Sequence, residues 1–107
     1  MRSRNISVML VDDHAVVREG FRRLLEKQEG IAVVAEAADA ASAYQIDKKQ
    51  EPDVVVVDLS MPGRGGIDAI RQIRQWDPTA RLLVFTMHLN TAFALQAFRA
   101  GAKGFVT

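Results

Sequence analysis

Residues 54–62 read VVVVDLSMP, and this stretch decides the fold because four consecutive valines end at a carboxylate, Asp58. Such an unbroken β-branched run is typical of a strand buried on both faces, as in a parallel sheet between two layers of helices. Gly63, Gly65 and Gly66 follow and indicate a loop. Ligands of open parallel sheets bind beyond the carboxyl ends of the strands, so we expect Asp58 to stand beside a ligand site.

A second apolar segment, Ile6–Val11, also ends at carboxylates, which are Asp12 and Asp13. Short apolar runs predict strands, and apolar residues at helical spacing predict the helices between them. The expected strands cover residues 6–11, 31–35, 54–58, 81–86 and 104–107. The expected helices cover about residues 14–28, 39–49, 66–76 and 91–101, with Gly30 as the residue that ends the first helix.

This alternation of strands and helices predicts one α/β domain over residues 1–107, with a doubly wound, five-stranded parallel sheet. For five strands the flavodoxin-like order 2-1-3-4-5 is the natural choice, and it makes the first and third strands neighbours. Asp12, Asp13 and Asp58 should therefore meet at one edge of the sheet. Thr86 should end the strand on the far side of Asp58.

The composition is that of an ordinary globular domain, with 49% hydrophobic and 25% charged residues. No apolar run approaches the roughly 20 residues of a membrane span, and the polar N-terminus lacks the apolar segment of a signal peptide. The absence of cysteine excludes disulfides and thiolate metal sites, and it is consistent with a cytoplasmic location. A net charge of +1 gives no electrostatic support for nucleic-acid binding, so we expect neither a nucleic acid nor a membrane as a direct partner.

The acidic cluster suggests a specific chemistry. Carboxylates that share a pocket repel one another, and a divalent cation removes that conflict. Oxygen ligands favour a hard ion, and Mg²⁺ fits because it binds few carboxylates and keeps several waters. A carboxylate held beside Mg²⁺ can attack a phosphoryl group and form an aspartyl phosphate. The Thr86 hydroxyl could then donate to a phosphoryl oxygen, and the Ser60 backbone carbonyl could reach the metal.

Plainer interpretations exist for each of these residues taken alone. An aspartate at a strand end more often caps a turn than binds a ligand. Turn capping does not require two adjacent aspartates beside a third, so the cluster as a whole favours a metal site. His14 directly follows the acidic pair, and we interpret it as an ordinary residue of the first helical turn rather than as a ligand. His88 receives the same interpretation, in an exposed loop.

Five short segments together form a recognisable pattern across nearly the whole chain. They are VDDH at 11–14, REG at 18–20, DLSMPG at 58–63, Thr86, and GAKGF at 101–105. In wording and spacing they resemble the receiver domain of two-component response regulators. The resemblance is closest to the subfamily whose receivers precede a LuxR-type helix-turn-helix.

The resemblance implies a function and a role for each site residue. A sensor histidine kinase would phosphorylate Asp58 and so control an output, in this subfamily transcription. Asp13, Asp58 and the Ser60 carbonyl would bind Mg²⁺, with Asp12 assisting through water. Thr86 and Phe105 would be the switch residues. Such a domain is not an enzyme beyond catalysing its own phosphorylation and dephosphorylation.

Two features depart from the family pattern. The family carries a lysine three residues after the aromatic switch position, which here falls one residue beyond Thr107, and Lys103 does not match that motif. The last helix of the family and its DNA-binding domain also lie outside the 107 residues. We therefore expect a C-terminally truncated receiver whose first helix is partly bare and which self-associates, for example as a homodimer. The apolar face of that helix carries Val17, Phe21, Leu24 and Leu25.

Three other functions remain open at the level of sequence. A flavodoxin-like nucleotide binder would share the architecture, but the acidic segment Asp12–His14 would repel phosphate in the absence of a metal. A Mg²⁺-dependent phosphohydrolase of the haloacid dehalogenase type uses an Asp-x-Asp motif, whereas Ser60 lies two residues after Asp58. A dimerisation module that works without phosphorylation would not need the acidic cluster.

Overall fold

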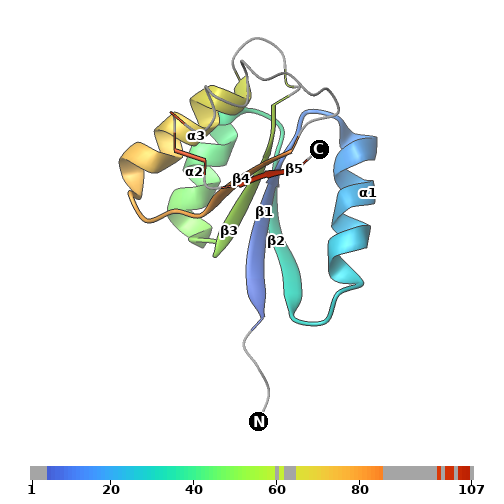
Figure 1. The fold of residues 1–107 in the computed structure, drawn as a ribbon. Coiled ribbons are helices and arrows are strands. Elements are labelled where there is room, and N and C mark those ends of the chain that lie inside the picture. Colours follow the sequence, from blue (N-terminus) through green and yellow to red (C-terminus); the bar gives the residue numbers. More distant parts are fainter. Residues whose placement is uncertain are drawn as a thin grey trace.

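The structure is a computed structural model, and it describes residues 5–59, 61, 65–85, 99, 101, 102 and the backbone of 104–106. Strands and helices alternate along these residues (Figure 1). The strands are β1 (Ile6–Val11), β2 (Ile31–Ala37), β3 (Val54–Asp58), β4 (Leu82–Phe85) and β5 (Gly104–Val106). The helices are α1 (Ala15–Glu26), α2 (Ala40–Gln50) and α3 (Gly65–Trp76). The helix expected over residues 91–101 lies almost entirely outside the described residues.

The strands form one sheet of order β2-β1-β3-β4-β5, and every neighbouring pair is parallel. The predicted order is confirmed for β2, β1, β3 and β4, and the backbone of β5 pairs with β4 from Leu83 opposite Gly104 onward. In the central pair, Val11 lies opposite Val57. This register brings the residues that follow β1 beside Asp58, the last residue of β3.

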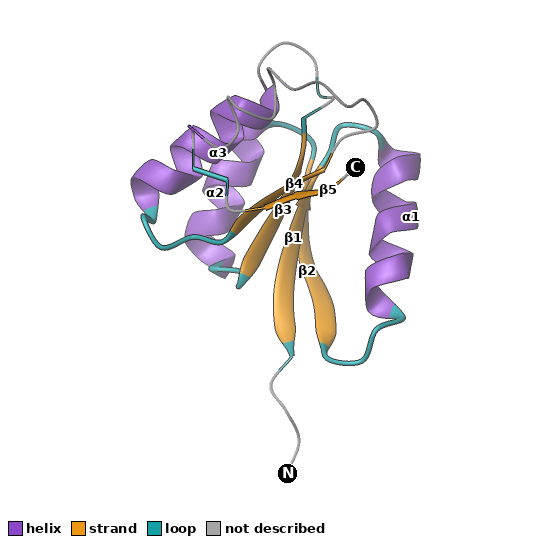
Figure 2. Cartoon of the chain, viewed as in Figure 1, coloured by secondary structure: helices purple, strands orange, loops and turns teal. Residues whose placement is uncertain are grey.

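Helices cover both faces of the sheet, with α2 and α3 on one side and α1 on the other (Figure 2). The larger core lies on the side of α2 and α3, where Ile67, Ile70 and Ile73 are at most 2% exposed. These isoleucines form the apolar stripe that the sequence predicts for α3. None of the helices in the described part of the chain is both long and apolar enough to cross a membrane.

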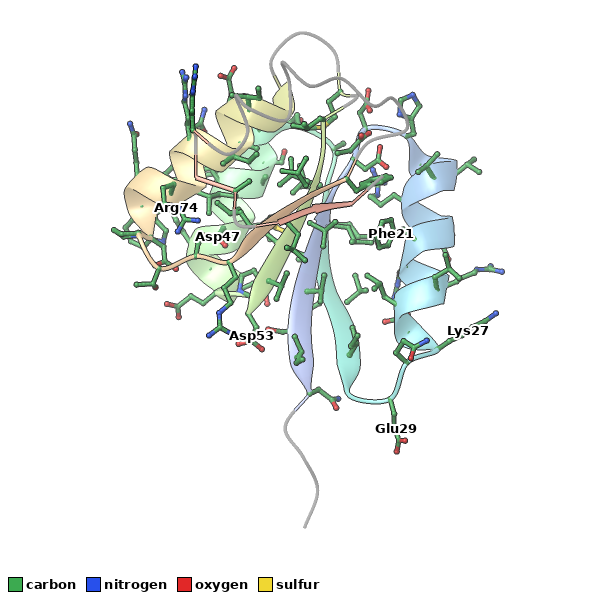
Figure 3. The ribbon with its side chains drawn as sticks, viewed as in Figure 1. Phe21, Lys27, Glu29, Asp47, Asp53 and Arg74 are labelled. Carbon is green, nitrogen blue, oxygen red and sulfur yellow. The ribbon has the colours of Figure 1, made fainter. Side chains whose placement is uncertain are left out.

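The α1 side carries a narrower apolar layer. Phe21 and Leu25 pack against side chains of β1 and β3, and the ring of Phe21 meets that of Phe85 edge-on with 5.0 Å between centroids (Figure 3). Leu24 was expected on the same face of a partly bare helix, and it is 64% exposed and does not pack as Phe21 and Leu25 do. Phe21 and Leu25 form one i,i+4 row along the helix, and Leu24 projects to the side of that row.

The first helix also ends earlier than the sequence predicts. Its last residue is Glu26 and its C-cap is Lys27, so Gly30 does not end the helix. Gly30 has a φ of 88° and instead forms part of the turn into β2, where its carbonyl accepts a hydrogen bond from the Ile6 amide at 2.6 Å. The left-handed conformation explains why a glycine occupies this position.

β2 departs from expectation in both length and register. It extends to Ala37 rather than to Ala35, because Glu36 and Ala37 continue the parallel pairing with β1. The register shifts once along this pair, so that Val33 and Ala35 face consecutive residues of β1 and Val34 is the extra residue of a bulge. Val33 therefore packs on the α1 side of the sheet, and Ala35 packs on the side of α2 and α3.

Candidate functional site

Three carboxylates lie at the carboxyl ends of the central strands β1 and β3. Asp58 is the last residue of β3 and is 2% exposed, and Asp12, directly after β1, is 3% exposed. Asp13 is exposed beside them, as is His14. One potential ligand atom from each of these four residues lies within 4.8 Å of the others. The predicted convergence of Asp12, Asp13 and Asp58 is therefore confirmed as geometry.

Asp12 is held in a single orientation by its neighbours. Its amide donates to the Ala37 carbonyl at 2.9 Å, and its carboxylate Oδ1 accepts from the His14 amide at 2.8 Å. The plain interpretation of Asp12 as a turn cap is thus correct for Oδ1. The other oxygen, Oδ2, is buried and accepts no hydrogen bond from any described group.

A buried carboxylate oxygen without a donor is costly, because it has lost its hydration and gained no partner. A hard cation placed among Asp12, Asp13 and Asp58 would remove that cost and would also offset the repulsion among the three carboxylates. The donor set consists of carboxylate oxygens, which Mg²⁺ prefers. The residues present therefore fit a magnesium site.

His14 takes a different place from the one the sequence suggested. It is the N-cap residue of α1 rather than a residue of the first turn, and its side chain makes no capping hydrogen bond. Its Nδ1 instead lies 3.0 Å from Asp13 Oδ1 and 3.5 Å from Asp12 Oδ1. Sequence reasoning missed this contact, and the only available signal was the position of His14 directly after two aspartates.

The first turn of α3 packs closely against the end of β3. A Cβ placed on Gly66 would lie 2.7 Å from the backbone oxygen of Asp58 and 3.2 Å from Leu59 Cα. On the other side, the Leu59 amide donates to the Phe85 carbonyl at 3.0 Å, which ties the end of β3 to β4. Together these contacts fix the backbone that carries Asp58.

The other site residues predicted from the sequence cannot be placed in the same way. Ser60 and Thr86 lie outside the described residues. Phe105 lies in β5, where its backbone pairs opposite Val84, and the structure describes only the backbone of this residue. Their roles stay predictions.

The family model that describes the response regulator receiver domain matches residues 8–107 of this sequence. The chain therefore belongs to the response regulator receiver domain family. The solved structure of a LuxR-family two-component response regulator from Aurantimonas sp. SI85-9A1 superposes with a TM-score of 0.91 at 61% identity. That match covers 96% of this chain and 74% of the other, so the receiver is of the kind found in LuxR-family regulators.

Two curated relatives are similar over almost the whole chain. The oxygen regulatory protein NreC of Staphylococcus haemolyticus is 41% identical over 102 residues, which are 94% of this chain and 47% of the relative. The response regulator UvrY of Escherichia coli is 39% identical over 102 residues, which are 95% of this chain and 47% of the relative. The chain thus spans about half the length of the curated relatives it matches.

Proposed function

We propose that this chain is a phosphorylation-switched receiver domain in which Asp58 accepts a phosphoryl group from a sensor histidine kinase in a Mg²⁺-dependent reaction. The observation that carries the proposal is the meeting of Asp12, Asp13 and Asp58 within 4.8 Å, with Asp12 Oδ2 buried and without a described donor. In a member of the receiver family, that arrangement favours phosphoryl transfer over a purely structural role for the carboxylates.

The residues of the chain would divide the work of the reaction. Asp12, Asp13, Asp58 and the Ser60 carbonyl would hold Mg²⁺, which offsets the negative charge that otherwise keeps a phosphoryl group away from three carboxylates. A carboxylate oxygen of Asp58 attacks the phosphorus, the phosphorus–nitrogen bond of the kinase phosphohistidine breaks, and the imidazole leaves with the electron pair. Water later attacks the same phosphorus and releases inorganic phosphate, so the chain catalyses only its own phosphorylation and dephosphorylation.

The phosphorylated state would then be read by other parts of a longer regulator. Thr86 would hydrogen-bond the phosphoryl group, and Phe105 would report the change through packing, because a phenylalanine ring donates no hydrogen bond. The output would be transcription in the cytoplasm, as the resemblance to receivers that precede a LuxR-type helix-turn-helix implies. Residues 1–107 would belong to the receiver, and their net charge of +1 gives no electrostatic support for direct contact with nucleic acid.

The test is incubation of the purified chain with acetyl phosphate, with and without Mg²⁺, followed by intact-mass measurement. We expect one phosphoryl adduct per chain, formed only with Mg²⁺, absent from Asp58→Asn and retained in the control Asp68→Asn. Asp68 is a suitable control because it is an exposed carboxylate in the first turn of α3. Phosphate release that continues unchanged in Asp58→Asn would instead indicate a phosphohydrolase that does not use Asp58, and no reaction would indicate a module that works without phosphorylation.

A further inference from the structure

Arg18 of α1 links the acidic cluster to the neighbouring strand β2. Its Nη1 donates to the backbone carbonyl of Asp12 at 2.6 Å, and its Nε donates to Glu36 Oε1 at 2.8 Å. The second oxygen of Glu36 accepts from Arg22 Nη1 at 3.1 Å. The side chains of Arg18 and Glu36 are only 20% and 26% exposed, so solvent screens this pair less than a surface ion pair.

The bulge in β2 is what brings Glu36 to this position. Side chains alternate between the two faces of a strand, and an unbroken β2 would place Glu36 on the face opposite Val33, beneath α2 and α3. The extra residue Val34 reverses that alternation, so Glu36 lies on the α1 side, where it pairs opposite Leu10. The bulge thus supplies a carboxylate to α1 from β2, the neighbour of the strand β1 that Asp12 and Asp13 follow.

The choice of acceptor on Asp12 matters for metal binding. Arg18 donates to the backbone carbonyl of Asp12 and not to its carboxylate. The guanidinium therefore does not occupy a carboxylate oxygen that a metal ion would need. Glu36 offsets the charge of the guanidinium at the same time. With the amide, the carbonyl and Oδ1 of Asp12 all bonded, Oδ2 has one fixed direction.

We propose that Arg18 is a positioning residue for the acidic cluster and that Glu36 holds it in place. This inference rests on the proposed Mg²⁺ site, and it gives a role to Arg18, which lies in the family segment at 18–20, and to Glu36, which lies outside the family segments. Arg18 fixes the backbone between β1 and α1, so that Asp12 and Asp13 present their oxygens to the metal without rearrangement. Groups that orient metal ligands in this way typically change metal affinity by about 10–100-fold when they are removed.

The test is titration of the folded chain with Mg²⁺ alone, followed by NMR shifts of backbone amides, in wild type, Arg18→Gln, Arg18→Lys and Arg23→Gln. Arg23 is the matched control, because it pairs with Glu19 on the same helix and its side chain is 77% exposed. We expect Arg18→Gln to raise the Kd for Mg²⁺ by about tenfold. Arg18→Lys should fall between that variant and wild type, because an ammonium can replace one hydrogen bond but not both.

The sign of the effect separates positioning from simple electrostatics. Removing a positive charge near three carboxylates would by itself tighten Mg²⁺ binding, whereas loss of positioning weakens it. Metal-free spectra give a second readout: signals of residues 12–14 should broaden or shift in Arg18→Gln and not in Arg23→Gln. Wild-type binding that Arg18→Gln leaves unchanged or tighter overturns the positioning role alone. Absence of Mg²⁺ binding in the wild-type chain overturns the proposed function, and this inference with it.

Discussion

At the scale of single residues, the two carboxylates of the acidic pair have different surroundings. Asp12 is buried and held through its backbone and Oδ1, whereas Asp13 is exposed and its carboxylate lies 3.0 Å from the imidazole Nδ1 of His14. In the proposed metal site, Asp12 would therefore contribute a rigid oxygen, and Asp13 would contribute the carboxylate that is most accessible to a metal arriving from solvent.

Replacing Asp13 by asparagine should weaken Mg²⁺ binding by more than the roughly tenfold effect of losing a group that only orients a ligand. The neutral amide keeps the size of the side chain and removes the charge that attracts the cation. Calorimetric or NMR titration would measure the change, with Asp68→Asn as the matched loss of a carboxylate away from the cluster. Equal affinities in Asp13→Asn and wild type would argue against the metal site.

Another buried carboxylate, Asp47, lies away from the acidic cluster, on the opposite side of the sheet from Phe21 (Figure 3). Burial raises the pKa of Asp47 above its ordinary value of 3.8, and the negative charges of Asp77 and Glu51 raise it further. The folded state therefore binds a proton more readily than the unfolded state, so ionised Asp47 lowers stability at neutral pH.

Replacing Asp47 by asparagine should raise the Tm at pH 7, because the amide is neutral at every pH. The gain should shrink as the pH falls through the raised pKa of Asp47, and it should disappear below the ordinary value of 3.8, where the carboxyl is protonated in both states. Thermal unfolding of both proteins between pH 3 and 7 would measure this, and a gain that grows toward acid would contradict it.

At the scale of elements, the start of α3 and the end of β3 are packed backbone against backbone at Gly66. Adding a methyl group there would bring it 2.7 Å from the Asp58 backbone oxygen, so one element must move. Gly20 in α1 gives the opposite case, because a Cβ at that position meets no atom within 4 Å among the described residues.

Gly66→Ala should therefore destabilise the chain by about 1–3 kcal/mol, as expected for overpacking, and should slow phosphorylation by displacing Asp58. Gly20→Ala should stabilise it by up to about 1 kcal/mol, because alanine favours the helical backbone. Urea unfolding would give both values. Similar stability changes for the two substitutions would show that the close approach at Gly66 does not constrain the fold.

The strands and helices also show which features of the site could be predicted from the sequence and which could not. The apolar runs predict that strands end at Asp12 and Asp58, and the expected strand order makes these two strands neighbours. The meeting of the two carboxylates could therefore be predicted from the sequence. The face on which Glu36 lies could not be predicted, because it depends on a one-residue bulge that is set by pairing with β1. The contact from Arg18 to the Asp12 carbonyl depends on how α1 is rotated about its axis, and sequence periodicity resolves that rotation too coarsely to place one hydrogen bond.

At the scale of the whole molecule, the sheet has two unequal cores. The side of α2 and α3 contains side chains with no exposed surface, such as Ile70 and Leu82, whereas the α1 side is closed by half-buried residues such as Phe21 and Phe85. Most of the apolar stabilisation therefore comes from the side of α2 and α3. The acidic cluster lies at the carboxyl ends of β1 and β3, the strands that contribute side chains to both cores.

Ile70→Ala should cost about 2–5 kcal/mol of unfolding free energy, because it removes fully buried methyl groups and leaves a cavity. Val16→Ala should change stability by no more than about 0.5 kcal/mol, because Val16 is 86% exposed. Urea unfolding of the two variants under identical conditions would compare them. A loss in Ile70→Ala no larger than that in Val16→Ala would contradict the assignment of the main core.

The central claim is that Asp58 is the phosphorylated residue, and mapping the modified residue tests it most directly. The chain is treated with acetyl phosphate and Mg²⁺, reduced with borohydride to convert the acyl phosphate into a stable alcohol, digested, and sequenced by tandem mass spectrometry. The predicted result is reduction at Asp58 alone, lost when Mg²⁺ is chelated. Reduction at Asp12, Asp13 or another carboxylate with Asp58 intact would contradict the assignment.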